Sequence, residues 1–157
     1  MVDQDRYEIL GGKQAVKGYE TFHLVKSEDL NHHGTLFAAR AAAWLVEAGF
    51  AAAACEHGNA DEVVLRCIQN MSYSKPVQKG TVVKLISRVV HAGNTSLTVA
   101  VTAEDAITEE LAIEGYLTFV TINKDTGKKQ SHAVSLDEAA DEKEEQLRRK
   151  AQKYCCP

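Results

Sequence analysis

Hydrophobic and polar residues alternate along several short stretches of the chain, which is the pattern of β-strands. The first such stretch follows a polar lead-in and covers residues 19–27. Further stretches of this kind then follow one another without a second helix, at residues 62–74, 81–91, 95–104 and 111–123. The links are short and turn-like, with Pro76, Gly80, Gly93 and Gly127 at their centres. Short links favour antiparallel pairing of the strands that they join.

Two of these stretches indicate which side chains share a face. In residues 95–104 the alternation is clean, and it places Leu97, Val99 and Val101 on one side. In residues 62–74 the same reasoning groups the larger apolar side chains on one side, namely Val63, Leu65, Cys67, Met71 and Tyr73. We expect these two faces to contribute to the hydrophobic core.

Between the first strand and the others, the pattern predicts a helix over residues 36–56, preceded by turn and N-cap residues at 27–35. The helix would be about 30 Å long. It is apolar on every side, so we expect it to be enclosed by other structure as a central helix. Residues 41–55 carry one charge, Glu47. Because burial of an unpaired carboxylate costs several kcal/mol, Glu47 either reaches solvent or has a chemical role.

The end of the chain predicts a second helix at about residues 135–153. Ser135 and Glu138 have the spacing of a capping box, the acidic residues lie early, and the basic residues lie late. These features indicate a charged helix on the solvated surface.

Composition narrows the class of protein. The 157 residues form one expected domain, 1–157, with a core at about 19–130. A net charge of −4 gives no general electrostatic reason to bind nucleic acid or an anionic membrane. The four cysteines lack the spacing of a disulfide scaffold or zinc site, the amino-terminal residues lack a secretory pattern, and the apolar run 41–55 is shorter than a membrane span of about 20 residues. We expect a soluble cytoplasmic protein.

The order of one strand, a long helix and four antiparallel strands resembles the hot-dog fold, in which a curved sheet wraps around a central helix. Within it, "DLNHHGTLFAARAAAWLVEAG" resembles the strand-to-helix turn of the acyl-CoA thioesterases of that superfamily. The matching residues are Asp29, Asn31, Gly34, Phe37, Ala38 and Ala39, with Glu47 as the carboxylate that follows on the helix. Further resemblance lies in "YSKPVQKGTVV", "VVHAGNTSLTVAV" and "GYLTFVTINKDTGKK". Together these segments cover about residues 19–130.

The resemblance implies an α+β hot-dog domain: an antiparallel sheet wrapped around the central helix, with the charged carboxyl-terminal helix added. It also implies a dimer or higher homo-oligomer whose active site lies between subunits. The expected activity is hydrolysis of an acyl-CoA thioester to a carboxylic acid and free coenzyme A. No cofactor or metal is expected, because coenzyme A is part of the substrate.

The chain departs from the family at two places. Ala38 and Ala39 stand where the family usually has a pair of glycines, so the backbone there is more crowded for a ligand. In the hydrolases that match best, the catalytic acid aligns with Val46, and Glu47 aligns with a neighbouring acid. Successive side chains on a helix point about 100° apart. The identity of the catalytic base therefore stays open. The candidates are Glu47 and a residue of the partner subunit.

The candidate catalytic residues follow from the needs of thioester hydrolysis: a base or nucleophile, a group that positions water, and donors for the oxyanion. Glu47 is the candidate base or nucleophile. Asn31 could hold the attacking water or the thioester oxygen, or be a turn or N-cap residue. The N–H of Gly34 is expected at the amino end of the helix, where it would stabilise an oxyanion.

His33 supports a second hypothesis. Its fourteen-residue separation from Glu47 resembles the His and Glu of hot-dog hydroxyacyl dehydratases or hydratases, although the Pro-rich turn of those enzymes is missing. Adjacent His32 and His33 give little support for a metal site, since no third ligand has suitable spacing. A third hypothesis is a non-catalytic acyl-CoA sensor, which Val46 at the usual acid position makes plausible.

The candidate contacts to coenzyme A lie on later turns and strands. They are Asn94, Thr95 and Ser96, with Lys75, Lys79 and Arg88 as candidates for the phosphates. Their simpler interpretation is a hairpin turn and ordinary solvated charges. Phe37 is a candidate for substrate binding, and its simpler interpretation, like that of Trp44, is a core position. The sequence does not indicate the length of the acyl chain.

Overall fold

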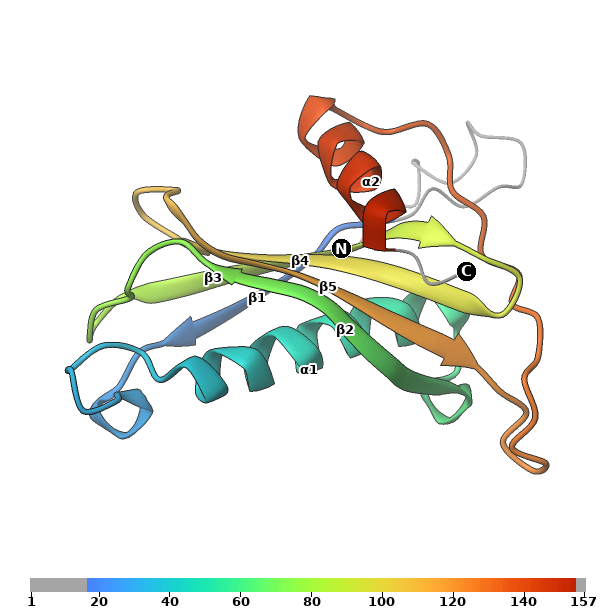
Figure 1. Ribbon diagram of the computed structural model, residues 1–157, viewed down its shortest axis with the longest axis horizontal. Helices are drawn as coiled ribbons and strands as arrows, with labels where there is room; N and C mark the ends of the chain where they lie inside the picture. Colours follow the sequence, from blue (N-terminus) through green and yellow to red (C-terminus); the bar gives the residue numbers. More distant parts are fainter. Residues whose placement is uncertain (1–16, 155–157) are drawn as a thin grey trace, which may run out of the picture.

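The computed structural model describes residues 17–154, which form one antiparallel sheet with a helix on each face (Figure 1). The sheet has five strands in the order β1-β3-β4-β5-β2. The strands are β1 (Tyr19–Leu24), β2 (Val63–Tyr73), β3 (Val82–Ala92), β4 (Ser96–Asp105) and β5 (Leu111–Thr121). The helices are α1 (Ala38–His57) and α2 (Glu142–Tyr154), and short 3-10 helices cover Ser27–Asp29 and Ala60–Glu62. The predicted sheet around a long helix is confirmed.

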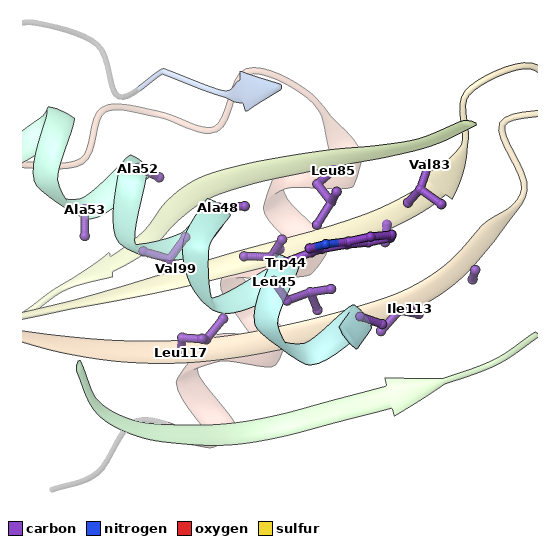
Figure 2. Close-up of a cluster of buried hydrophobic side chains, with 14 of the residues drawn as sticks. Trp44, Leu45, Ala48, Ala52, Ala53, Val83, Leu85, Val99, Ile113 and Leu117 are labelled. Atoms are coloured by element: carbon purple, nitrogen blue, oxygen red, sulfur yellow. The ribbon is translucent and has the colours of Figure 1, made fainter. Parts of the chain in front are cut away.

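The core lies between α1 and one face of the sheet. Alternate residues of β3 and β4, such as Leu85 and Val99, point toward the helix and are fully buried (Figure 2). On α1 the facing residues include Trp44, Leu45 and Ala48. The face predicted for residues 95–104 is therefore confirmed, since Leu97, Val99 and Val101 all have 0% exposure. Burial of this apolar surface is the main force that holds α1 on the sheet.

The sheet and α1 approach each other closely at two glycines. A Cβ atom on Gly115 of β5 would lie 3.0 Å from Cδ2 of Leu45. A Cβ atom on Gly49 of α1 would lie 3.4 Å from Leu117 and Val101. The missing side chains thus allow the helix to rest directly on the strands.

Strand β2 corrects one prediction from the alternation pattern. Its pairing with β5 shifts register between Leu65 and Cys67 and again between Ile68 and Asn70. Each bulge inserts a residue and reverses the alternation after it. Cys67 therefore pairs with Thr118, whereas Ile68 pairs with the core residue Leu117. Because opposed residues share a face, the residues of β2 that face α1 are Val63, Leu65, Ile68, Met71 and Tyr73. The prediction of Cys67 on that face is wrong.

Within residues 17–154, helix α1 is covered on one side only, so the prediction that it is enclosed on every side is wrong for this part of the single chain. Its buried residues lie toward the sheet. The opposite side is an open stripe of mostly small side chains: Ala39, Arg40, Ala43, Glu47, Ala51 and Cys55, all exposed. Alanine occurs on buried and exposed helix faces alike, so the composition did not reveal which side the sheet covers. Below, these six residues are called the open stripe of α1.

The length of α1 differs from that of the apolar run 41–55, which was judged too short to span a membrane. At 20 residues it is longer than the apolar run on which that expectation rested, and by length and composition it could cross a membrane. Core helices of soluble proteins can have the same length and apolar composition. Here the helix packs along the sheet through Trp44, Leu45 and Ala48, which are all buried.

The predicted carboxyl-terminal helix exists, but it begins at Glu142 instead of residue 135. Ser135 and Glu138 precede it and do not cap it. The carboxylate of Asp141 instead accepts a hydrogen bond from the N–H of Glu144 at 2.8 Å. One side of α2 is not solvated, because Ala151 packs with Val90 and Tyr116 on the outer face of the sheet. Strands β4 and β5 are consequently buried on both faces.

Candidate active site

The turn before α1 is organised by Asn31. The side-chain oxygen of Asn31 accepts hydrogen bonds from the N–H groups of His33 (2.9 Å) and Thr35 (3.2 Å). Its amide nitrogen donates to Oγ1 of Thr35 at 3.1 Å. Asn31 is therefore a turn residue, as one interpretation of the sequence held, and it is not an N-cap. Since an amide nitrogen carries two hydrogens, one donor of Asn31 remains for a ligand.

Gly34 lies in this turn rather than at the amino end of the helix. Its φ of +79° is readily adopted only by glycine, and its N–H donates to the carbonyl of Asn31 at 3.1 Å. Residues 36 and 37 stay extended because their N–H groups bond to Val77 (2.8 Å) and Asp29 (2.8 Å). The helix begins only at Ala38. The free donors at its amino end are therefore those of its first turn, residues 38–40, and the expectation for Gly34 is corrected accordingly.

Glu47 lies on the open stripe of α1 and is exposed in the single chain. Among residues 17–154 it has no hydrogen bond or ion pair, and Arg40, the one basic residue of the same stripe, pairs with Asp29 at 3.3 Å. The neighbouring Val46 is half-buried and packs against the core. The sequence left two possibilities for Glu47, contact with solvent or a chemical role, and in the single chain its side chain contacts solvent. Because the fold of one chain does not bury this carboxylate, burial is no evidence that Glu47 has a chemical role.

The structure does not bring the candidate catalytic residues together within one chain. Glu47 lies nine residues into α1, which is about 14 Å along the axis from the start of the helix. Asn31 and His33 lie before that start, and His33 is exposed, with its ring 3.9 Å from that of His32. No group of three or more His, Cys, Asp or Glu side chains in the described part of the chain could hold a metal ion.

Trp44 and Phe37 differ in exposure to solvent. Trp44 is a core residue, as predicted: it is buried and stacks on the ring of His23, with centroids 4.3 Å apart and planes 8° apart. Phe37 is 51% exposed, directly before the first turn of α1. Its alternative interpretation as a core residue is therefore wrong, and its side chain is accessible to a ligand.

The coenzyme A candidates lie at opposite ends of the molecule. Lys75 and Lys79 lie in the link between β2 and β3, next to the Asn31 turn, because Thr35 forms a bridge with Gln78. Lys79 is exposed, whereas the ammonium group of Lys75 pairs with Glu110 at 2.7 Å.

The turn of Asn94, Thr95 and Ser96 lies at the other end of β3, roughly 35 Å away for a strand of this length. It contacts a later segment: Asn94 accepts a hydrogen bond from Ser131 at 2.9 Å, and the ring of His132 lies 3.0 Å from the carbonyl of Ser96. One chain therefore does not offer all these contacts to one coenzyme A molecule.

Arg88 is not available for a phosphate of the substrate. The alternation of β3 places it on the outer face, away from α1, where its guanidinium donates to the carboxylate of Glu144 at 2.7 Å. Arg148 donates to the same carboxylate at 2.6 Å. Burial would raise the pKa of Glu144, but the hydrogen bonds from Ala140 and Arg148 and the charge of Arg88 lower it below its usual value. Arg88 therefore anchors α2, which corrects the expectation for this residue.

Comparison with known proteins decides the family. The sequence model of the thioesterase superfamily matches residues 33–112, which is more than half of the chain. The chain belongs to the thioesterase superfamily. No curated protein sequence matches it.

Solved structures agree with this assignment. An acyl-CoA hydrolase from Staphylococcus aureus, solved with butyryl coenzyme A, coenzyme A and coenzyme A disulfide, has a TM-score of 0.76 and 25% identity, covering 87% of this chain and 80% of that one. A hexameric acyl-CoA thioesterase has a TM-score of 0.75 and 26% identity, with 87% of each chain covered. A hexameric hotdog fold thioesterase of Campylobacter jejuni, at 24% identity and a TM-score of 0.59 over 82% of this chain and 93% of that one, supports the fold alone.

Sequence reasoning did not identify Tyr73 as a candidate site residue of this member of the thioesterase superfamily. It is the last residue of β2, and its hydroxyl donates to the carbonyl of Ala38 in the first turn of α1 at 2.8 Å. Burial raises the pKa of this hydroxyl. The ring forms part of a pocket at the amino end of α1. The sequence signal for Tyr73 was its place near the end of the strand predicted at residues 62–74, on the side expected to face the core.

Proposed function

We propose that the chain hydrolyses acyl-CoA thioesters to a carboxylic acid and free coenzyme A. The observation that carries this proposal is the match to the thioesterase superfamily, together with likeness over 87% of the chain to an acyl-CoA hydrolase that was solved with butyryl coenzyme A. The Asn31 turn, the free donors of the first turn of α1 and an exposed carboxylate supply the types of group that the reaction needs.

The active enzyme is a homo-oligomer, at least a dimer. Strand β2 is an edge of the sheet, and four of its apolar side chains are exposed: Val64 43%, Leu65 37%, Ile68 46% and Tyr73 46%. An unpaired edge with apolar side chains favours pairing with another chain. The open stripe of α1 adds small side chains that a second helix can approach closely. One of the similar structures, at 26% identity, is described as hexameric.

Assembly also explains the separation of the candidate catalytic groups. Asn31 and Glu47 are apart within one chain, so a complete site requires Glu47 of the partner subunit beside the Asn31 turn. In that arrangement the carboxylate takes a proton from water as the water oxygen bonds to the thioester carbonyl carbon. The remaining amide hydrogen of Asn31 and the first N–H groups of α1 donate to the developing oxyanion. The carbon–sulfur bond then breaks, and coenzyme A leaves as its thiolate.

The phosphates of coenzyme A are proposed to contact Lys79, with Lys75 nearby. Both lie beside the Asn31 turn, and Lys79 has no ion-pair partner within residues 17–154. The turn of Asn94, Thr95 and Ser96 contributes only if another subunit brings it to the same ligand. We also propose a cytoplasmic location, where cysteines such as Cys55 and Cys67 usually stay outside disulfide bonds.

A non-catalytic acyl-CoA sensor remains the second candidate, because Val46 packs against the core at the position where the resemblance places the catalytic acid. Turnover separates the two functions. The test is release of free thiol from acetyl, butyryl, hexanoyl, octanoyl and dodecanoyl coenzyme A by the purified oligomer. Hydrolysis of at least one thioester is expected. Binding of these thioesters without thiol release would establish the sensor instead.

A further inference from the structure

A pocket lies between the first turns of α1, the end of β2 and the link to β3. Its apolar lining includes four buried residues: Leu36 at 8% exposure, Ala41 at 1%, Val77 at 8% and Ile113 at 2%. Tyr73, Ser74, Lys75 and Pro76 complete the lining and are exposed. The buried residues therefore close the inner end, and the exposed ones form the mouth. We refer to these eight residues as the Tyr73 pocket.

The volume of the pocket limits what it can hold. Its volume is about 150 Å³, and it is open to solvent at the mouth. A cavity of this volume with an aliphatic lining holds benzene, a molecule of about six carbon atoms. Such a pocket accepts a short acyl tail, whereas a long fatty acyl tail would have to leave part of its apolar surface in water.

Hydrogen bonds hold the ring of Tyr73 in one wall of the pocket. The hydroxyl of Tyr73 is held by the carbonyl of Ala38, and it also lies 3.3 Å from the sulfur of Met71. At the mouth, the ammonium group of Lys75 pairs with Glu110 at the surface. At the inner end, Ile113 extends from β5 past Leu45 toward the amino end of α1 (Figure 2). A longer acyl chain would therefore have to displace packed side chains.

The position of the mouth fits the proposed reaction. At the mouth, the hydroxyl of Tyr73 donates to the carbonyl of Ala38 in the first turn of α1, so the mouth lies beside the proposed oxyanion donors of that turn. An acyl tail in the pocket would leave its carbonyl carbon near the first turn of α1, while the coenzyme A portion remains outside.

We infer that the Tyr73 pocket binds the acyl tail and restricts the substrate to short acyl groups of about six carbons or fewer, with Ile113 at its inner end setting the limit. This inference rests on the proposed function. The pocket thereby assigns a substrate class that the fold alone leaves open.

The test compares kcat/KM for the series from acetyl to dodecanoyl coenzyme A in the wild-type oligomer and in Ile113→Ala. The wild type should fall at least about tenfold beyond the length that fits, because one methylene in an apolar pocket changes kcat/KM by roughly 10- to 200-fold. Ile113→Ala removes three carbons from the inner end, so its optimum should move to longer chains, with the octanoyl-to-butyryl ratio rising at least about tenfold.

The control is Leu97→Ala, which truncates a fully buried aliphatic residue of β4 that does not line the pocket. It should lower the melting temperature as Ile113→Ala does, but keep the wild-type order of chain lengths. Equal kcat/KM for butyryl and dodecanoyl coenzyme A in the wild type, or the same shift in both variants, would overturn the inference while leaving the hydrolase function in place. Absence of hydrolysis at every length would overturn the hydrolase function and this inference with it.

Discussion

At the scale of single residues, the structure changes the meaning of the lone charge in α1. Glu47 stands out in the sequence because it lies among apolar residues, yet it is exposed on the open stripe of α1. Alanine fits a helix face that contacts a sheet, a partner or water, so the sequence could not assign the covered face. Asn31 was easier to predict, because the preference of asparagine for turns is local.

His33 distinguishes hydrolysis from dehydration at the same scale. His33→Ala should change kcat/KM for thioester hydrolysis by less than about threefold, because the proposed reaction uses a carboxylate as its base. The backbone hydrogen bond from residue 33 to Asn31 does not depend on the imidazole, so the turn should persist. The measurement is free-thiol release with the best acyl-CoA. A loss of hundredfold or more would instead favour His33 as a catalytic acid or base.

At the scale of elements, sequence patterns located the strands and both helices but not their interruptions or ends. The bulges of β2 place Ile68 where simple alternation expected Cys67. The start of α2 was placed seven residues early, because Ser135 and Glu138 have the spacing of a cap. Val134 and Leu136 pack against the core instead, and this segment has no regular secondary structure. Such tertiary contacts override local propensity and are not visible in the local pattern.

The attachment of α2 should depend on pH through Glu144. Its pKa is lowered in the folded protein, so its contribution is complete above the unfolded value of 4.5 and is lost as the pH falls through the lower folded pKa. Glu144→Gln should cost about 1–3 kcal/mol of unfolding free energy near pH 7, since it removes charge-assisted hydrogen bonds from Arg88 and Arg148. The difference from wild type should shrink below pH 4.5. Urea unfolding at pH 7 and pH 3.5 measures it.

Glu145→Gln is the matched control on the same helix. Its partner Arg149 and Glu145 itself are both exposed, so the change should stay within about 0.5 kcal/mol at either pH. If Glu144→Gln were equally neutral at pH 7, the ion pairs that join α2 to β3 would have no part in the stability of the fold.

At the scale of the whole molecule, the sequence predicted the architecture but not the separation of the candidate site residues over distant parts of the chain. The hot-dog arrangement follows from the order of elements and one central helix. The distribution of Asn31, Glu47 and the candidate coenzyme A contacts over distant parts of the chain depends on topology and on assembly, neither of which is encoded in local periodicity. A single chain therefore presents the parts of the proposed site without joining them.

Self-association should depend on the exposed apolar side of β2. Ile68→Lys places a charge where the proposed interface is dry, so it should shift the wild-type oligomer toward the 17.2 kDa monomer at micromolar concentration. Ile107→Lys is the control, because Ile107 is 84% exposed in the turn between β4 and β5. Sedimentation velocity measures both. An unchanged oligomer with Ile68→Lys would place the interface elsewhere.

The most direct test of the account is the steady-state rate of coenzyme A thiol release by the wild-type oligomer and by Glu47→Gln with the best acyl-CoA substrate. Glutamine keeps the shape of the side chain but removes the base, so kcat should fall by about a hundredfold or more while acyl-CoA binding changes little. Glu138→Gln, an exposed acid in the segment before α2, should retain the wild-type rate. Hydrolysis by Glu47→Gln at the wild-type rate would contradict the proposed role of this carboxylate.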